Sequence, residues 1–321
     1  MDRCSRHDDA PIASKHILEL DPTRFAGGIA LWGAVPAVYS TAVHDMDDLG
    51  VHVHARRQPR KKKLIDQTYK LVIARLSGAD RSCRTIDVRA DDAISYMVSS
   101  IFGQQLKYLE CAHCGEPHLD KDTFSVTRHQ THLCYACGRN FRDAVPGIAN
   151  PLMGLKEFCG DTQVNRRTIP ANRPLNVSQS QFPMGIELWG SHEAILWTSS
   201  APEESGIHFH GYTNNFMVPT IDETYDSVTI DDIQLDNLQL RILMAQQVLP
   251  HLKGRIVSLE CSSCGEAHFD TGAMAHTPHS EHTCECGAIL VSPGRVKNVV
   301  SNPMIATLAR LEQTAVRPRR W

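Results

Sequence analysis

The sequence has no apolar run long enough to cross a membrane. Its most apolar stretch, IALWGAVPAV at positions 29–38, is interrupted by Gly33 and Pro36, whereas a spanning helix needs about 18 or more apolar residues. The first residues, MDRCSRHDDAPIASKH, also lack the apolar core of a signal peptide. We therefore expect no membrane span and no export, and we predict a cytoplasmic protein.

A large excess of either charge is also absent. The chain has 33 lysines and arginines against 36 aspartates and glutamates, a net charge of −3, so the molecule as a whole is not a polycation that coats nucleic acid. With 42% hydrophobic and 21% charged residues, its composition is that of a folded protein. Its length of 321 residues is typical of about two domains.

Several common catalytic motifs are missing. The sequence contains no G-x-x-x-x-G-K-[ST] phosphate-binding loop, no G-x-S-x-G nucleophile elbow and no H-E-x-x-H helix. These absences exclude the best-known signatures of nucleotide hydrolysis, serine hydrolysis and zinc-dependent proteolysis. Any chemistry has to come from other residues.

Cysteine, by contrast, is frequent and unevenly placed. Eight of the 11 cysteines fall in two similar stretches, ECAHCGEPHLDKDTFSVTRHQTHLCYACG at 110–138 and ECSSCGEAHFDTGAMAHTPHSEHTCECG at 260–287. In each stretch two close pairs are separated by 19 residues. This spacing is typical of a four-thiolate zinc site, because each pair supplies one arm of a tetrahedral chelate. The predicted ligands are Cys111, Cys114, Cys134, Cys137, Cys261, Cys264, Cys284 and Cys286.

Both stretches resemble zinc-ribbon modules. The resemblance implies one Zn2+ ion in each, held in a closed site that stabilises a loop-rich segment rather than reacting. The second stretch departs from the first, since Cys284 and Cys286 are one residue closer than Cys134 and Cys137; His279 or His282 could replace a thiolate there. An odd number of cysteines with metal-type spacing favours a reducing compartment.

The repetition extends beyond the cysteines. GIALWG at 28–33 returns as GIELWG at 185–190, GVHVH at 50–54 as GIHFH at 206–210, and IDQTY at 65–69 as IDETY at 221–225. The unchanged order and nearly constant spacing within the chain predict an internal duplication rather than an array of short repeats. The predicted boundaries are an extension at 1–24, a first domain at 25–160, a linker at 161–181, a second domain at 182–312 and a basic tail at 313–321.

Each predicted domain combines strands with one helix. IALWGA and GVHVHAR are rich in β-branched and aromatic residues and end at turn residues, as strands do. Apolar residues recur at helical spacing from Ile94 to Ile101, and again from Leu238 to Leu249 between Asp236 and Pro250. The sequence predicts an α+β fold in which each domain has an antiparallel sheet, one helix and a zinc-ribbon-like segment.

The histidines suggest a second kind of metal site. His52 and His54 point to one side of a predicted strand, and combined with the H-x-x-H of the cysteine loop they could bind a metal with an open position that activates water. The eight candidates are His52, His54, His129, His132, His208, His210, His279 and His282. Repeated polar residues could support them by hydrogen bonding or act as a base: Asp66, Tyr69, Glu116, His118, Asp120, Asp222, Tyr225, Glu266, His268 and Asp270. The alternative is that all of these only cap turns and orient the cysteine loop.

A basic run distinguishes the two predicted domains. It comprises Arg56, Arg57, Arg60, Lys61, Lys62 and Lys63, whereas the corresponding loop GYTNNFMVPT at 211–220 is uncharged. The fold therefore does not need these cations, and they could bind an anionic partner, either nucleic acid or an acidic protein surface. The apolar residues Tyr212, Phe216 and Met217 of the uncharged loop would suit a protein assembly.

Two functions follow from these patterns. The first is a zinc-stabilised binding or adaptor protein that contacts an anionic partner through the basic run. The second is a metalloenzyme of hydrolase type that uses the repeated histidines. Metal content separates them, because about two Zn2+ ions per chain favour the first and about four favour the second.

Overall fold

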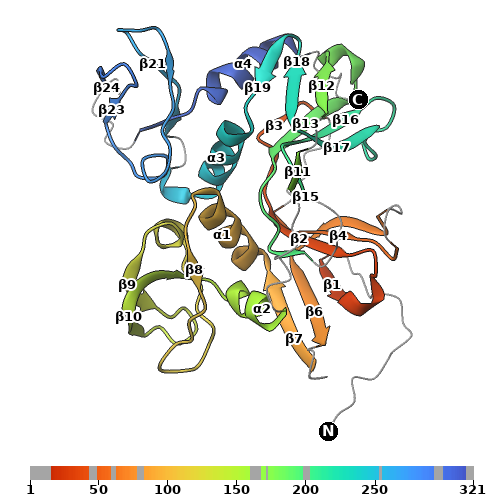
Figure 1. Ribbon diagram of the computed structural model, residues 1–321, viewed down its shortest axis with the longest axis vertical. Coiled ribbons are helices and arrows are strands. Elements are labelled where there is room, and N and C mark those ends of the chain that lie inside the picture. Colours follow the sequence, from red (N-terminus) through yellow and green to blue (C-terminus); the bar gives the residue numbers. More distant parts are fainter. Residues whose placement is uncertain are drawn as a thin grey trace.

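The computed structural model describes residues 16–42, 49–58, 63–77, 83–159, 168–170, 173–197, 203–252, 255–292 and 299–315. This part of the chain forms a mixed fold with four α-helices and many small sheets. Figure 1 shows two helices, α1 and α3, between the larger sheets on one side and two loop-rich segments on the other. Within the described ranges, no helix is both long and apolar enough to cross a membrane.

Two four-stranded antiparallel sheets form the larger body. One has the order β14-β2-β4-β5 and the other β17-β16-β13-β3. Their strands are β2 (Ile29–Ala34), β3 (Tyr39–Ser40), β4 (Gly50–Ala55), β5 (Ile65–Tyr69), β13 (Gly185–Gly190), β14 (Leu196–Trp197), β16 (Ile207–Tyr212) and β17 (Ile221–Tyr225). The edge strands are exchanged, since β3 pairs with β13 and β14 pairs with β2. The two regions predicted as separate domains therefore contribute to each other's sheets.

The outer sheets contain parallel pairs, which the prediction of purely antiparallel sheets missed. β1 (Ile17–Leu20) runs parallel to β6 (Leu71–Ser77), which pairs with β7 (Cys83–Arg89). β12 (Pro174–Val177) likewise runs parallel to β18 (Ser227–Ile230), which pairs with β19 (Ile233–Leu235). A further parallel pair joins β11 (Thr168–Pro170) and β15 (Glu203–Ser205). β1 lies in the predicted extension, and β11 and β12 lie in the predicted linker.

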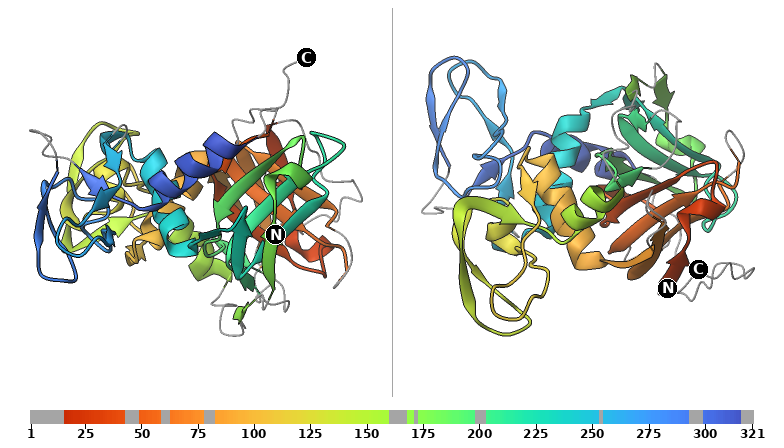
Figure 2. Two further views of the ribbon diagram at one scale, coloured as in Figure 1. Left: turned by 90° about the horizontal axis from the view of Figure 1, so that it is seen from above. Right: turned by 60° about the horizontal axis from the view of Figure 1, so that its bottom comes forward.

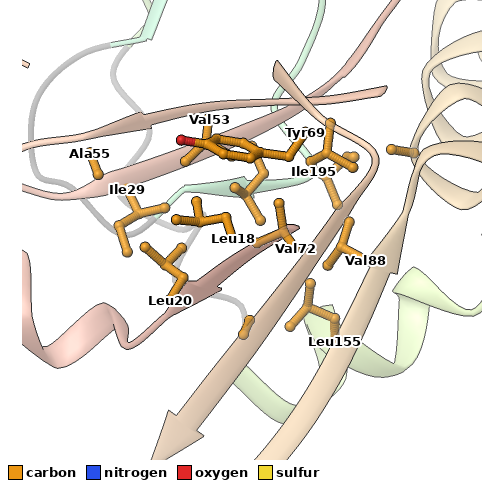
Figure 3. Packing of buried hydrophobic residues seen from close by; sticks show 14 of the residues in the cluster. Leu18, Leu20, Ile29, Val53, Ala55, Tyr69, Val72, Val88, Leu155 and Ile195 are labelled. Atoms are coloured by element: carbon orange, nitrogen blue, oxygen red, sulfur yellow. The ribbon is translucent and has the colours of Figure 1, made fainter. Parts of the chain in front are cut away.

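Burial explains why β1 is part of the fold. Leu18 and Leu20 are almost completely buried and pack with Val53, Tyr69 and Val72, as Figure 3 shows from close by. A fully buried leucine contributes about 1.5–3 kcal/mol relative to an exposed one. The alternating pattern of Ile17–Leu20 thus fastens the start of the described chain to the first core.

The two predicted central helices are confirmed as α1 (Ala90–Ile101) and α3 (Asn237–Val248). The Asp236 carboxylate caps α3 by accepting a hydrogen bond of 2.8 Å from the backbone N–H of Gln239. Gly103, at φ 66°, follows the end of α1 in the left-handed conformation that favours glycine. Met97 of α1 and Ala245 of α3 belong to one buried cluster, so the helices join the two regions.

Two further helices correct the prediction of one helix per domain. They are α2 (Leu152–Cys159) and α4 (Met304–Thr314). Asn150 and Asn302 precede them, each accepting a hydrogen bond of 2.9 Å from the N–H two residues later. Each asparagine also donates from Nδ2 to a carbonyl of α1 or α3. Asn-Pro is a helix-start signal that could have revealed both helices.

The loop-rich segments lie beyond α1 and α3. The first contains β8 (Leu106–Lys107), β9 (His129–Leu133) and β10 (Asn140–Ala149). The second contains β20 (Ile256–Val257), β21 (Leu259–Glu260), β22 (Ala267–His268), β23 (Glu281–Thr283), β24 (Ile289–Val291) and β25 (Val300–Ser301). Figures 1 and 2 show both segments on the opposite side of the helices from β2, β4, β13 and β16.

Candidate metal centres

All eight predicted cysteines meet in two groups of four. The Sγ–Sγ distances are 3.7 Å for Cys111–Cys137, 3.7 Å for Cys114–Cys134, 3.7 Å for Cys261–Cys286 and 3.6 Å for Cys264–Cys284. Four sulfurs at about 2.3 Å from a tetrahedral ion lie about 3.8 Å apart, far beyond the length of about 2.05 Å of a disulfide. Both clusters fit zinc-ribbon-like motifs and are compatible with two zinc ions.

The backbone around each first cysteine pair forms a tight turn that aims the sulfurs. The N–H of Cys111 donates to the Glu116 carbonyl at 2.9 Å, and the N–H of Gly115 donates to the Cys111 carbonyl at 2.8 Å. Gly115 has φ 73°, a conformation that costs other residues energy. Cys261 and Gly265 repeat these contacts. The glycine after the second cysteine is therefore part of the ligand-positioning turn.

The shorter pair in the second cluster still supplies both sulfurs. The N–H of Cys284 donates to the Ala288 carbonyl, and Gly287 takes φ 85° to close the turn. Cys286 thereby reaches Cys261. The hypothesis that His279 or His282 replaces a thiolate is not what the structure shows, because both histidines contact Asp270 instead.

The backbone also favours the thiolate form that binds metal. The N–H groups of Cys264 and Ser263 lower the pKa of Cys261 to about 6. Burial raises the pKa of the Cys111 thiol, but the N–H groups of His113 and Cys114 lower it, so that it is also about 6. One sulfur of each cluster is thus ready to act as the first ligand near neutral pH.

His52 and His54 on β4 meet Asp66 on β5, and these three residues are termed the first triad. Strand register places His54 directly opposite Asp66. The Nε2 atoms of the histidines are 2.9 Å apart, and Asp66 Oδ1 lies 3.2 Å and 3.1 Å from them. Thr68 Oγ1 is 3.0 Å from His52 Nδ1 and orients that ring. Three donor atoms therefore face one point and leave further coordination positions open.

His208 and His210 on β16 and Asp222 on β17 form the second triad in the same register. The Nε2 atoms are 3.0 Å apart, and Asp222 Oδ1 lies 3.4 Å and 3.2 Å from them. Three donor atoms again converge on one point, as they do in the first triad.

The second triad has an additional carboxylate. Glu187 Oε2 lies 3.5 Å from His210 Nδ1 and accepts a hydrogen bond of 2.7 Å from the Tyr212 hydroxyl. In the first triad the corresponding position on β2 is Ala30, which pairs with His54 as Glu187 pairs with His210. The two triads therefore share their ligand geometry and differ in the groups that surround it.

Lys63 connects the two triads. Its Nζ lies 2.5 Å from Asp66 Oδ2 and 3.3 Å from Asp222 Oδ2. Because one ammonium contacts both carboxylates, the distance between Asp66 Oδ2 and Asp222 Oδ2 cannot exceed the sum of these two distances. The two triads face each other across a single lysine, which the sequence had assigned to the basic run.

The histidines of the two triads differ in their protonation state. Burial lowers the pKa of His54 to about 3 and that of His208 to about 4, although the neighbouring aspartates act in the opposite direction. Burial would also lower the pKa of His210, but hydrogen bonding with Asp222 and Glu187 raises it to about 9. His54 and His208 are thus neutral near pH 7, the form that binds metals, whereas His210 is protonated and has to lose its proton when a metal binds.

The four candidate histidines outside the triads, together with His118 and His268, form two other clusters, each around one aspartate. Asp120 Oδ1 lies 2.8 Å from His118 Nε2, 3.1 Å from His129 Nε2 and 3.2 Å from His132 Nδ1. Asp270 Oδ1 lies 3.0 Å from His268 Nε2, 3.3 Å from His279 Nε2 and 3.2 Å from His282 Nδ1. We refer to these groups as the first and second trihistidine clusters.

The structure thus divides the histidines that were expected to form one site. His52 and His54 lie on β4, and His129 and His132 lie on β9, on the other side of α1 in Figure 1. The single combined site is not formed. The H-x-D pattern of His118 and Asp120 is a local signal for the first trihistidine cluster, whereas the pairing of His54 with Asp66 depends on the register of β4 and β5.

The other predicted supporting residues have structural contacts. Tyr69 packs in the same hydrophobic core as Leu18, and Tyr225 packs in a separate second hydrophobic core. The Glu116 and Glu266 carbonyls accept from the first cysteine of each cluster. Tyr212 is buried, whereas Phe216 and Met217 are exposed.

Of the basic run, Arg57 is exposed, Arg56 is half-buried and Lys63 contacts the triads. Arg60, Lys61 and Lys62 lie outside the described residues.

Comparison with known proteins gave no family: no family model, no curated protein and no solved structure matches this chain. Function is therefore argued from the geometry of the clusters.

Proposed function

We propose that this protein is a metal-dependent hydrolase. In this proposal the two cysteine clusters hold structural Zn2+, and the two triads hold the ions that activate water. The observation that carries the proposal is the arrangement of the triads, each with two imidazoles and one carboxylate converging within 3.4 Å, facing each other across Lys63.

The number of ligands distinguishes the two kinds of cluster. A closed set of four thiolates leaves no position for a substrate, whereas three protein ligands leave room for water. Zinc bound in this way lowers the pKa of its water to about 7 and so produces a nucleophile at neutral pH. Glu187 contacts Nδ1 of His210, the ring nitrogen that faces away from the triad, and we assign it the role of orienting that ligand and raising its basicity.

We further propose that the anionic partner expected from the basic run is the substrate. Lys63 ends that run and lies between the two triads. In this proposal Lys63 and the other cations of the run attract a negatively charged ester, with nucleic acid as the favoured class. We thus propose that binding and chemistry share one site.

The similarity of the triads supports an internal duplication of residues 25–160 and 182–312. Trp32 pairs with His52 as Trp189 pairs with His208. His54 pairs with Asp66 as His210 pairs with Asp222. Exchange of β3 and β14 then joins the two copies into one body. We propose that duplication brought two equivalent metal sites together.

The proposal predicts metal-dependent turnover by the full-length protein. The purified chain is stripped with a chelator that leaves the cysteine-bound zinc in place, as checked by metal analysis. It is then reloaded with Zn2+, Mn2+, Co2+ or Fe2+ and incubated with phosphomonoesters, phosphodiesters and labelled single-stranded DNA and RNA. Hydrolysis should disappear on stripping and return with at least one ion. Absence of hydrolysis with every ion and substrate would contradict the proposal.

Removing the basic run should weaken substrate binding without removing metal. Replacing Arg60, Lys61 and Lys62 with alanine removes three phosphate contacts, and each contributes about 0.7–0.9 to the slope of log affinity against log salt. We expect the slope for single-stranded DNA, measured by fluorescence anisotropy, to fall by about 2. The matched control replaces Arg317, Arg319 and Arg320 in the tail, which changes the net charge equally. Equal slopes for the two variants would contradict a specific role for the run.

A further inference from the structure

The two trihistidine clusters are not used by the proposed reaction. Each brings four side chains from one loop-rich segment to a common point, and each lies close in sequence to a cysteine cluster. We propose that each cluster binds a second metal ion, so that each zinc-ribbon-like segment holds two ions of different ligand type. The chemistry of the donors, three imidazoles and one carboxylate, suits Zn2+.

Distances between the donor atoms match a metal site. Ligands at about 2.0–2.1 Å from a tetrahedral ion are about 3.3–3.4 Å apart. The six contacts from the aspartate Oδ1 atoms to the imidazole nitrogens range from 2.8 Å to 3.3 Å. A small inward relaxation of the ligands relative to a filled site accounts for the difference. The distances from each aspartate oxygen to its three imidazole nitrogens are therefore close to those that a tetrahedral ion requires.

Hydrogen bonding alone explains the clusters poorly. One carboxylate oxygen has two lone pairs, yet three ring nitrogens converge on Asp120 Oδ1. In the second cluster, His279 Nε2 and His282 Nδ1 also face each other at 2.9 Å. A cation at the centre of each cluster would let the nitrogen lone pairs point inward.

The clusters are closed and anchored, which indicates a structural ion. Asp120 is 3% exposed and His132 is fully buried, so four protein donors leave no position for water. Asp120 Oδ2 accepts a hydrogen bond of 2.7 Å from the Ala149 N–H, and its backbone carbonyl accepts one of 2.8 Å from Ser95 of α1. An ion held by Asp120 would therefore fasten the ribbon-like segment to α1 and to the start of α2.

The second cluster has the corresponding anchor. Asp270 Oδ2 accepts hydrogen bonds from the N–H of Ser301 at 2.8 Å and from its hydroxyl at 3.1 Å. Asn302, the next residue, caps α4. In both segments the cysteine cluster includes exposed cysteines, while the trihistidine cluster lies at the junction with the helices. The cysteine ion orders the segment, and the second ion fixes its position on the body.

Metal analysis of isosteric variants tests this inference. Asp120→Asn and Asp270→Asn keep the shape of the side chain and remove its charge. Each variant should retain one fewer Zn2+ per chain than wild type after dialysis, and the double variant two fewer. The cobalt-substituted variants should lose part of the absorption of nitrogen–oxygen-ligated Co2+, because the triads keep their ions, and should retain the thiolate charge-transfer band. Asp87→Asn, an aspartate on β7 outside the triads and the trihistidine clusters, is the control.

The outcomes of this metal analysis can be distinguished from those of the assays that test the proposed hydrolase activity. His54→Ala removes a triad ligand and should lower the metal count of Asp120→Asn further, because the two clusters bind separate ions. If Asp120→Asn does not fold, His129→Ala, at the most exposed ligand of the cluster, must show the same loss. Wild-type metal content in a folded Asp120→Asn and a folded His129→Ala protein would overturn the inference, whatever the activity.

Discussion

Replacing Cys134 with serine is expected to remove one zinc ion per chain and to destabilise the protein severely. Cys134 is buried beside Cys111 and Phe141, and its sulfur lies 3.7 Å from that of Cys114. Zinc binding contributes about 10–16 kcal/mol in zinc-finger peptides. Losing even a third of this would lower the melting temperature by about 7–21 °C, since 1 kcal/mol corresponds to about 2–4 °C in larger domains.

The matched control for Cys134→Ser is His113→Ser. His113 lies between the first pair of cysteines, and serine occupies the corresponding position, Ser263, in the second cluster. This variant should keep all of its metal and nearly all of its stability. Zinc content by mass spectrometry and melting by calorimetry distinguish the two. A Cys134→Ser protein with wild-type metal content and melting temperature would show that the four sulfurs are not a zinc site.

The cysteine clusters and the central helices could be predicted because their signals are local. Cys-x-x-Cys-Gly contains the ligands, their spacing and the glycine that takes a positive φ at Gly115 and Gly265. The helix signals around Asp91 and Asp236 are also contained within one turn of chain. Such patterns survive in the fold because no distant partner is needed to complete them.

The parallel pairing of β1 and the exchange of β3 and β14 could not be predicted in the same way. β1 is four residues long, and its partner β6 begins about fifty residues later. β3 and β14 have two residues each and pair with strands more than 140 residues away in sequence. A short strand carries too little pattern to specify a distant partner, so tertiary burial decides the pairing.

The prediction that these histidines form one combined site was wrong for a related reason. Period-two alternation correctly placed His52 and His54 on one face of β4. Their third ligand was decided by the register of the β4–β5 hairpin, whose connecting loop carries the basic run. Loop composition does not determine that register. Lys63, expected to contact an anionic partner, is placed between two carboxylates of the chain itself by the approach of the two sheets.

The triads should lose their metal and their activity when His54 and His210 are both replaced with alanine. Each is one of only three ligands in its triad, so the ion loses a third of its protein coordination. Removing a residue that merely hydrogen-bonds a ligand costs about 10–100-fold in metal affinity or activity. Losing a ligand should lower metal affinity and activity by more than about 100-fold. The double variant should therefore retain two fewer ions per chain after dialysis. Both side chains are partly exposed on their sheets, so the fold should remain.

Thr68→Val provides a graded control for this prediction. Thr68 contacts His52 Nδ1 at 3.0 Å but donates no metal ligand, so its loss should cost about 10–100-fold in metal affinity. The single variants His54→Ala and His210→Ala then show which triad performs the chemistry. Glu187 is present only beside His210, and if its contact strengthens that ligand for catalysis, His210→Ala should abolish turnover while His54→Ala leaves a measurable rate. Full activity in the double variant would assign the triads a role outside catalysis.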